Sequence, residues 1–470
     1  MSRIERKAFW TLVVASVSLC IVMLDNLVVV TALPVIRVAL HANVEQLEWT
    51  VNAYTLTFAV LLLTGAALGD RFGRRRMFCI GLSIFTLASA AAALSPDTHV
   101  LIAARAVQGA GSAIVTPLTL TLLSAAFPEN KRGLALGIWT GVSGISVAAG
   151  PIVGGALTQG ISWHWIFWLN VPIGAALVPF AAFRLRESFG PAARLDLRGL
   201  TLASAGLLGI VWGMINANSK GWTSAPILAA LAVGAALVGL FVVWELRAPA
   251  PMLPMHFFRN RAFSAANGAS VLMYFGMFGS IFLLAQFLQT AQGYSPFSAG
   301  LRLLPWTAVP LAVAPAAGIL AERIGGRPLM VVGLALQSIG LAWFAAVAAP
   351  KAAYIEIVGP FIVTGIGMSM FFAPVTLVVL AAVRTHEEGQ ASGAMNALRE
   401  LGGVFGVAVM AAVFSAYGSF RSPSAFTDGV VAATWVGAAA VGAGALVSLW
   451  VPRTVMADKP AEAAAPAHGT

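Results

Sequence analysis

The chain has 470 residues, of which 59% are hydrophobic and only 10% are charged, and its mean hydropathy is +0.87. Because soluble domains carry roughly 25% charged residues, this sequence cannot cover a water-facing surface, and a soluble protein is excluded. The apolar residues form long runs near the ~20 residues that span a bilayer as a helix. The alternating segments of about 10 residues that build a membrane β-barrel are absent. We therefore predict an all-α integral membrane protein.

Fourteen apolar runs follow one another along the chain, with short connections between them. We predict transmembrane helices at about residues 9–33, 47–68, 77–94, 100–123, 134–158, 166–184, 199–217, 226–246, 264–290, 299–321, 328–348, 354–380, 390–415 and 430–451. The first run follows the basic stretch "MSRIERKAFW" and is too long for a signal-peptide core, so we expect it to be retained.

The basic residues predict how the helices are oriented. If the N-terminus is cytoplasmic, all but seven of the 28 Lys and Arg residues fall on the cytoplasmic side, as the positive-inside rule requires. The seven are Arg37, Arg105, Lys220, Arg302, Lys351, Arg399 and Arg421. We therefore expect a multi-pass protein of the bacterial inner membrane with both termini in the cytoplasm. The net charge of +10 is then an orientation signal, and we expect no nucleic-acid partner.

The sequence lacks the residue patterns that disulfide frameworks, metal sites, ATP-binding loops and catalytic nucleophiles require. Cys20 and Cys79 lie in different apolar runs and form no disulfide framework, and the six histidines show no metal-ligand spacing. None of the five lysines stands in a Walker loop, and no G-x-S-x-G marks a nucleophile. We expect no metal, no cofactor and no enzyme activity, so any transport must be driven by a gradient.

An internal repeat divides the chain into two halves. The loop "GDRFGRRRM" (69–77) matches "AERIGGRPL" (321–329) in acid, arginine, glycine and arginine at a constant offset of 252 residues. Parallel repeats of this kind are a known plan of transporters, whereas a channel would not need two halves with matching loops. We predict an N-terminal six-helix bundle at 1–190, two inserted linker helices at 191–250, a C-terminal six-helix bundle at 251–455 and a disordered Ala/Pro-rich tail at 456–470.

The repeated loops are candidate gating elements on the cytoplasmic side. Glycine permits a tight turn there, and Asp70 can cap the next helix or pair with an arginine. A simple positive-inside anchor is the alternative, and the second copy at a fixed offset weakens it. The predicted gating residues are Gly69, Asp70, Arg71, Gly73, Arg74, Arg75, Glu322, Arg323 and Arg327.

These motifs together resemble a known family. "GDRFGRRR" resembles the cytoplasmic loop signature of the major facilitator superfamily, "RAVQGAGSAIVTP" (105–117) its fourth-helix motif, and "GISVAAGPIVGG" (144–155) the fifth-helix motif of antiporters. "LDNLVVVTALP", "EWTVNAYTL", "WHWIFWLNVPIG" and "QFLQTAQGYSPFSAGLRLLP" are similar to the fourteen-helix drug:H⁺ antiporters. The resemblance covers residues 9–451 and implies a multidrug efflux transporter that works by alternating access.

The fifth predicted helix carries small residues and a proline at its centre: Gly150, Pro151, Gly154 and Gly155. Proline removes a backbone hydrogen bond and bends a helix, and small residues allow a close helix–helix approach. Glycine and proline are also simply common in membrane helices. The resemblance implies that the bend seals one side of the cavity and favours exchange over leak. In the second half, Gly406 is followed by Val407 instead of proline.

Four charged residues lie inside predicted helices: Asp25, Arg105, Arg399 and Glu400. Such residues usually face the bundle interior and mark function. Asp25 lies past the middle of its helix, within expected reach of Arg105. The resemblance links this aspartate to proton coupling, and an adjacent guanidinium favours the ionised carboxylate whereas burial favours the neutral one. Glu400 is a second proton site, a cation-attracting group or a member of a structural ion pair; these alternatives stay open.

The sequence departs from the family pattern near these charges. Leu27 and Val30 replace the Thr and Asn that usually follow the aspartate, and Glu400 stands where an amide is more common. The departure leaves open which groups hydrogen-bond Asp25. It does not change the expected role of the carboxylate.

Aromatic, methionine and amide side chains suggest a greasy, adaptable substrate cavity. The predicted lining residues are Tyr54, Gln108, Met273, Tyr274, Gln286, Gln289, Phe371, Phe372 and Asn396. We predict a monomeric, proton-coupled exporter of amphipathic, cationic drugs or toxic metabolites. An exporter of lipids or endogenous metabolites on the same fold is the alternative.

Overall fold

The computed structural model describes residues 3–190, 195–384 and 387–453. Within these ranges, fourteen segments are long and apolar enough to cross a membrane, and the regular secondary structure is helical. The all-α prediction with fourteen spans is confirmed. The tail predicted to be disordered at 456–470 lies outside the described residues.

The first half of the chain contains seven helices that form six of these spans. The sixth span, Trp165–Arg184, consists of the two short helices α6 and α7. The helices are α1 (Arg3–Ala39), α2 (Val44–Phe72), α3 (Arg74–Ala93), α4 (Thr98–Ala126), α5 (Glu129–Gly160), α6 (Trp165–Trp168) and α7 (Asn170–Arg184). Pro172 has no N–H to donate to the carbonyl of Trp168, so the helix is interrupted between α6 and α7. This interruption lies next to Asn170.

Two further spans separate the halves: α8 (Leu197–Lys220) and α9 (Ala225–Glu245). They pack closely on each other because Gly206 faces Gly234; a Cβ atom on Gly206 would lie 3.0 Å from the Gly234 carbonyl oxygen. On its other side α8 contacts both α2 and α15, so it covers a junction between the halves.

The second half again supplies six spans. After the short 3₁₀ helix η1 (Met255–Arg259), its helices are α10 (Arg261–Gln286) with the π-helical turn η2 (Phe287–Ala291), α11 (Pro296–Thr307), α12 (Val309–Ile324), α13 (Gly326–Val347), α14 (Tyr354–Ala381), α15 (Glu388–Tyr417) and α16 (Pro423–Ser448). The span predicted at 299–321 is broken at Ala308, because Pro310 cannot donate to the carbonyl of Trp306.

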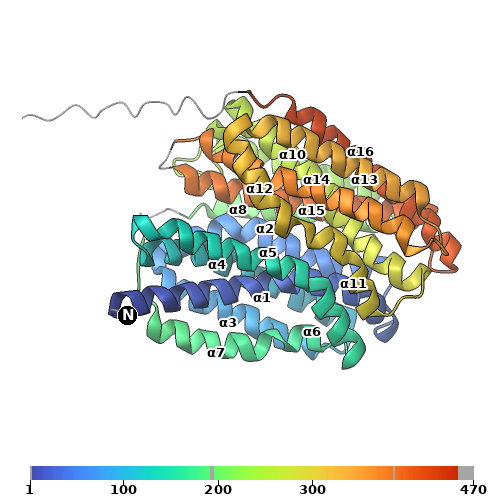
Figure 1. Cartoon of the computed structure of the whole chain (residues 1–470), viewed down its shortest axis with the longest axis horizontal. Coiled ribbons are helices and arrows are strands. Elements are labelled where there is room, and N and C mark those ends of the chain that lie inside the picture. The colour runs from blue at the N-terminus through green and yellow to red at the C-terminus, as the bar shows by residue number, and fades with distance from the viewer. Residues whose placement is uncertain (1–2, 191–194, 385–386, 454–470) are drawn as a thin grey trace, which may run out of the picture.

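The two sets of helices form two adjoining bundles. In Figure 1, α1–α7 lie together in the lower part, α10 and α12–α16 lie together in the upper part, α11 lies at the lower right, and α8 lies between the two sets. The halves meet where α2 packs against α15 and where α5 packs against α11. Each bundle therefore carries its own set of candidate site residues.

The repeated loops adopt the same turn in both halves. Gly73 ends α2 with φ 102° and Gly325 ends α12 with φ 85°, values that L-residues with a side chain rarely adopt. The Gly73 N–H donates to the Gly69 carbonyl (3.0 Å), and the Gly325 N–H donates to the Ala321 carbonyl (2.9 Å). The matching glycines thus close matching helix ends.

The halves are joined near the ends of the helices that we predict to face outward. The Gln289 amide donates to the Thr31 carbonyl (2.8 Å) between η2 and α1. Gly155 on α5 is so close to α11 that a Cβ atom there would lie 2.4 Å from the Pro296 carbonyl oxygen. The two halves are thus in contact at their predicted outer side, an arrangement that we call closed-outside.

Candidate functional site

Asp25 lies at the centre of a buried polar cluster in the first half. Its Oδ2 atom forms an ion pair with the Arg105 guanidinium. Its Oδ1 atom accepts hydrogen bonds from the side-chain amides of Gln108 (2.9 Å) and Asn170 (2.8 Å). All four side chains are 0% exposed. A buried carboxylate is tolerated when a cation and hydrogen bonds compensate it, and α4 and α7 supply these partners.

A second set of contacts holds Arg105 in place. Its Nη1 atom also donates to Gln108 Oε1 (2.7 Å) and its Nε atom to the Thr50 carbonyl on α2 (3.2 Å). The guanidinium carbon lies 4.2 Å from the centre of the Tyr54 ring, a cation–π geometry. The Tyr54 hydroxyl in turn donates to Ser112 (2.9 Å). Only the Nη2 atom of Arg105 lacks a partner, so this cation is almost fully compensated.

The sequence reasoning paired Asp25 with Arg105 but missed Asn170. Asn170 lies in "WLNVPIG", where the helix-breaking Pro172 follows two residues later. The interruption after α6 precedes the residue whose amide reaches Asp25. The signal that could have found it was a polar residue beside a proline within an apolar run.

The apolar Leu27, which stands where a Thr is usual, lies at a close contact between α1 and α5. A Cβ atom on Gly150 would lie 2.7 Å from Leu27 Cβ, and one on Gly154 would lie 2.8 Å from the Val28 carbonyl oxygen. Leu27 and Val30 are buried. Amides from α4 and α7 serve as donors to Asp25, while α1 presents apolar residues to α5.

The small residues of α5 also contact the second half. A Cβ atom on Gly300 of α11 would lie 2.2 Å from the Pro151 carbonyl oxygen. Together with Gly155, this places the predicted antiporter motif against both α1 and α11. The helix continues through Pro151. The predicted role of the motif in exchange stays a prediction.

The charges of the second half have fewer partners. On α15, Arg399 is 7% exposed, its Nη2 atom donates weakly to Thr376 Oγ1 (3.3 Å), and its Nε atom lacks a partner. The Oε2 atom of Glu400 also lacks a hydrogen bond. Within the described ranges Glu400 forms no ion pair, so the structure does not show the ion pair with a neighbouring helix that was one alternative for it.

Aromatic rings surround these charges. The Tyr274 ring on α10 stacks on Phe278 with the ring centres 5.7 Å apart and meets Phe372 of α14 edge-on at 6.0 Å. The Arg399 guanidinium carbon lies 5.7 Å from the Tyr274 ring centre. Tyr274 and Phe372 are half-buried and Asn396 is exposed on α15. These three predicted cavity residues lie on helices around the Arg399–Glu400 pair.

Several other predicted cavity residues do not face an open space in this structure. Met273 and Phe371 are 0% exposed and belong to the hydrophobic core. Gln286 bonds to a carbonyl of its own helix, and Gln289 joins η2 to α1. Tyr54 and Gln108 belong to the Asp25 cluster. Apolar and amide side chains also serve helix packing, so the cavity role of these residues stays a prediction.

The first repeated loop is tied to the end of the first half. Asp70 pairs with Arg74 (2.8 Å), and Glu187, beyond α7, accepts the backbone N–H groups of Arg75 (2.8 Å) and Arg76 (3.2 Å). Glu187 therefore caps the start of α3, a role the sequence reasoning considered only for Asp70. In the second loop, Glu322 and Arg323 are exposed and form no ion pair with a described residue.

The chain matches the family model of the Major Facilitator Superfamily over residues 15–407. It is 35% identical to the multidrug resistance protein Stp of Mycobacterium tuberculosis, over 88% of this chain and 77% of that protein. It is also 35% identical to the tetracenomycin C resistance and export protein of Streptomyces glaucescens, over 85% of this chain and 74% of that one. Among solved structures, the xylose transporter XylE of E. coli superposes with a TM-score of 0.63 at 15% identity, covering 96% and 99% of the two chains.

Fold, repeats and relatives agree on the class of protein, a multi-pass membrane transporter and not an enzyme. The chain belongs to the major facilitator superfamily, and the resemblance found in its motifs is confirmed.

Proposed function

We propose that this protein is a proton-coupled antiporter that exports amphipathic, cationic drugs or toxic metabolites from the cytoplasm. The observation that carries the proposal is the sealed cluster of Asp25 and Arg105 inside the first half of a transporter. Curated relatives, including Stp and a methylenomycin A resistance protein of Bacillus subtilis that is 34% identical, are named for resistance, which supports drugs as the cargo.

The geometry suggests how protons and conformation are linked. In this closed-outside arrangement Asp25 is paired with Arg105 and excluded from water. Protonating Asp25 there would leave a buried guanidinium without its counter-ion, which is unfavourable. Water must therefore reach the cluster in another conformation before a proton can be bound. A carboxylate whose partner and hydration change with conformation is what gradient-driven exchange requires.

The second half is the proposed contact region for cargo. Tyr274, Phe278 and Phe372 offer ring faces, and Glu400 offers a carboxylate oxygen without a partner. Ring faces and a carboxylate together favour an organic cation. We place both termini in the cytoplasm of a bacterium, with the protein acting as a monomer in the inner membrane.

Transport in proteoliposomes tests this proposal. The purified chain is reconstituted, a pH gradient is imposed, and the accumulation of a cationic dye, a lipophilic cation and a neutral antibiotic is followed. We expect gradient-dependent accumulation of the cations that an uncoupler abolishes. Accumulation that is unchanged by the uncoupler would exclude proton coupling. Transport of lipid analogues alone would favour the alternative exporter.

A further inference from the structure

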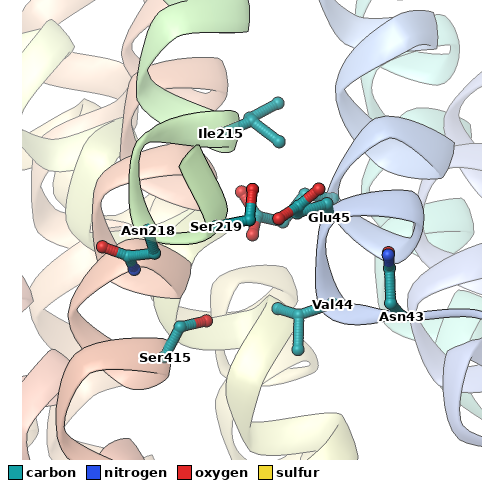
Figure 2. Close-up of a pocket in the computed structure, with 8 residues that line it drawn as sticks. Asn43, Val44, Glu45, Ile215, Asn218, Ser219 and Ser415 are labelled. Atoms are coloured by element: carbon teal, nitrogen blue, oxygen red, sulfur yellow. The ribbon is translucent and has the colours of Figure 1, made fainter. Parts of the chain in front are cut away.

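A pocket with polar and apolar lining residues lies at the predicted outer side, where α2, α8 and α15 meet. Its volume is about 280 Å³. Figure 2 shows Asn43, which caps α2, Glu45 on α2, Asn218 and Ser219 on α8, and Ser415 on α15 around it. The pocket is thus formed by both halves of the transporter and by the first inserted helix.

Glu48 is the buried acid of this pocket. It lines the pocket, is only 2% exposed, and its Oε2 atom has no hydrogen-bond partner. One turn further along α2, Asn52 is 0% exposed and neither polar atom of its side chain has a partner. Because burial without a partner disfavours the ionised form of a carboxyl group, Glu48 is expected to be neutral in the unliganded pocket, and a cationic ligand would favour its carboxylate.

The surrounding groups do not supply a cation. Among the described residues that line the pocket there is no Lys or Arg, and Glu45 adds a second carboxyl group. The nearby Lys220 lies over the Trp212 ring, 4.5 Å from its centre. The Asn218 side chain is occupied at both ends, since it donates to the Ala412 carbonyl (2.5 Å) and accepts from Trp222 (2.8 Å). The polar part of the lining therefore offers two carboxyl groups and no cationic side chain.

We propose that this pocket binds an organic ammonium group, held by Glu48 and Glu45. An ammonium ion only donates hydrogen bonds, which suits a lining that offers two carboxyl groups. No group of three or more His, Cys, Asp or Glu residues among the described residues is arranged to hold a metal ion, so an organic cation fits better than a metal. The volume equals that of about nine water molecules, enough for an ethanolamine or choline group.

The location of the pocket makes it accessible to an ammonium group from either of two sources, a lipid headgroup or a free amine. The pocket lies near the start of α2 at Val44 and near the ends of α8 at Lys220 and α15 at Tyr417. Helix ends lie at the level of lipid headgroups, so an amine-bearing lipid can reach it. A free amine from the medium carries the same chemistry.

Binding at this pocket would act on the conformational equilibrium. Glu48 belongs to the first half and Ser415 to the second, and both line the same cavity in the closed-outside structure. A ligand that contacts both sides favours the conformation in which they are close. The bound ammonium group thus stabilises the closed-outside state.

Thermal unfolding of the full chain in lipid nanodiscs tests the proposal without any transport assay. In phosphatidylglycerol discs, which contain no amine, choline or ethanolamine is titrated; in a second arm, phosphatidylethanolamine replaces part of the lipid. We expect a saturable rise of the unfolding midpoint in at least one arm. A response to the soluble amines identifies a free ligand, and a response to phosphatidylethanolamine alone identifies a lipid headgroup.

Two variants and a control assign the response to this pocket. Glu48→Gln should abolish the rise, because it removes the charge and keeps the shape. Glu356→Gln, an exposed glutamate near the start of α14, should keep it. Ser415→Leu fills the pocket from α15, keeps both Glu45 and Glu48, and should also abolish the rise. This variant tests the proposal if Glu48→Gln does not fold. No rise in the wild type, or an equal rise in either pocket variant, would overturn the proposal.

Discussion

The two halves of this transporter treat their buried acids differently. Asp25 in the first half has an ion pair and two amide donors, whereas Glu400 in the second half has an oxygen without any partner. Repeats of one ancestral bundle have thus become one sealed cluster and one under-satisfied pair. The Asp25 cluster is suited to binding a proton, which needs no open cavity. The Arg399–Glu400 pair is suited to reversible binding of a ligand, because its polar atoms still lack partners.

The difference has a structural origin. Asp25 is surrounded by donors from α4 and α7, and the interruption of the sixth span lies next to Asn170. Around Glu400, the neighbouring groups are rings and the weakly bonded Arg399. The unpaired Glu400 oxygen and the weakly bonded Arg399 therefore make this region the candidate place for a ligand.

The largest effect is expected for Asp25→Asn. The amide keeps the shape but leaves Arg105 as a buried cation without its counter-ion, at a cost of about 3–5 kcal/mol. Gradient-driven accumulation in proteoliposomes should fall to the uncoupled background. Asp97→Asn, at the exposed start of α4, is the matched control and should transport normally. Retained gradient-driven transport by Asp25→Asn would remove Asp25 from the coupling mechanism.

A selective effect is expected for Glu400→Gln. If the free carboxylate contacts cationic cargo, its loss should raise the apparent KM for monovalent organic cations about tenfold, corresponding to ~1.4 kcal/mol. Transport of a neutral antibiotic should change little. Equal losses for cationic and neutral cargo would instead indicate that Glu400 acts on the proton or on folding.

Asn170→Ala should give an intermediate effect. It removes one of the amide donors to Asp25 (2.8 Å), and a hydrogen bond to a charged group is worth about 1.5–3 kcal/mol. We expect the pH dependence of transport to shift while the ion pair itself is kept. Asn216→Ala, whose amide donates to a carbonyl of its own helix, is the control. An identical pH profile in Asn170→Ala and the wild type would contradict a coupling role for this amide.

Sequence reasoning reached the class, the fourteen spans and the Asp25–Arg105 pair because each has a local signal. Long apolar runs predict spans, and a charge within such a run needs a partner. The contact between Asn170 and Asp25 was not predicted, because the distance between these residues depends on how α7 packs against α1. Met273 and Phe371 lie in the hydrophobic core of this structure, and their role in a cavity stays a prediction, because their residue types are common to cavities and cores.

A smaller effect should distinguish the two repeated loops. Glu187 accepts two backbone N–H groups at the start of α3, and loss of such a cap costs about 0.5–2 kcal/mol. Its counterpart loop has the exposed Glu322, whose replacement should leave stability unchanged. Thermal unfolding of Glu187→Ala and Glu322→Ala compares them directly. Equal midpoints would show that the first loop gains nothing from its cap.

The smallest effect is expected where an ion pair is exposed instead of buried. Between α14 and α15, the Arg384 guanidinium hydrogen-bonds Glu387 (2.7 Å), which lowers the pKa of the Glu387 carboxyl from 4.5 to about 2. A lowered pKa in the folded state contributes stability above pH 4.5 that is lost as the pH falls towards 2. Because the Arg384 side chain is 62% exposed, solvent screening keeps this contribution small. Glu387→Gln should therefore unfold slightly earlier than the wild type at pH 7, with the difference shrinking towards pH 3. A constant difference across this range would mean that Glu387 stabilises the protein through its shape and not its charge.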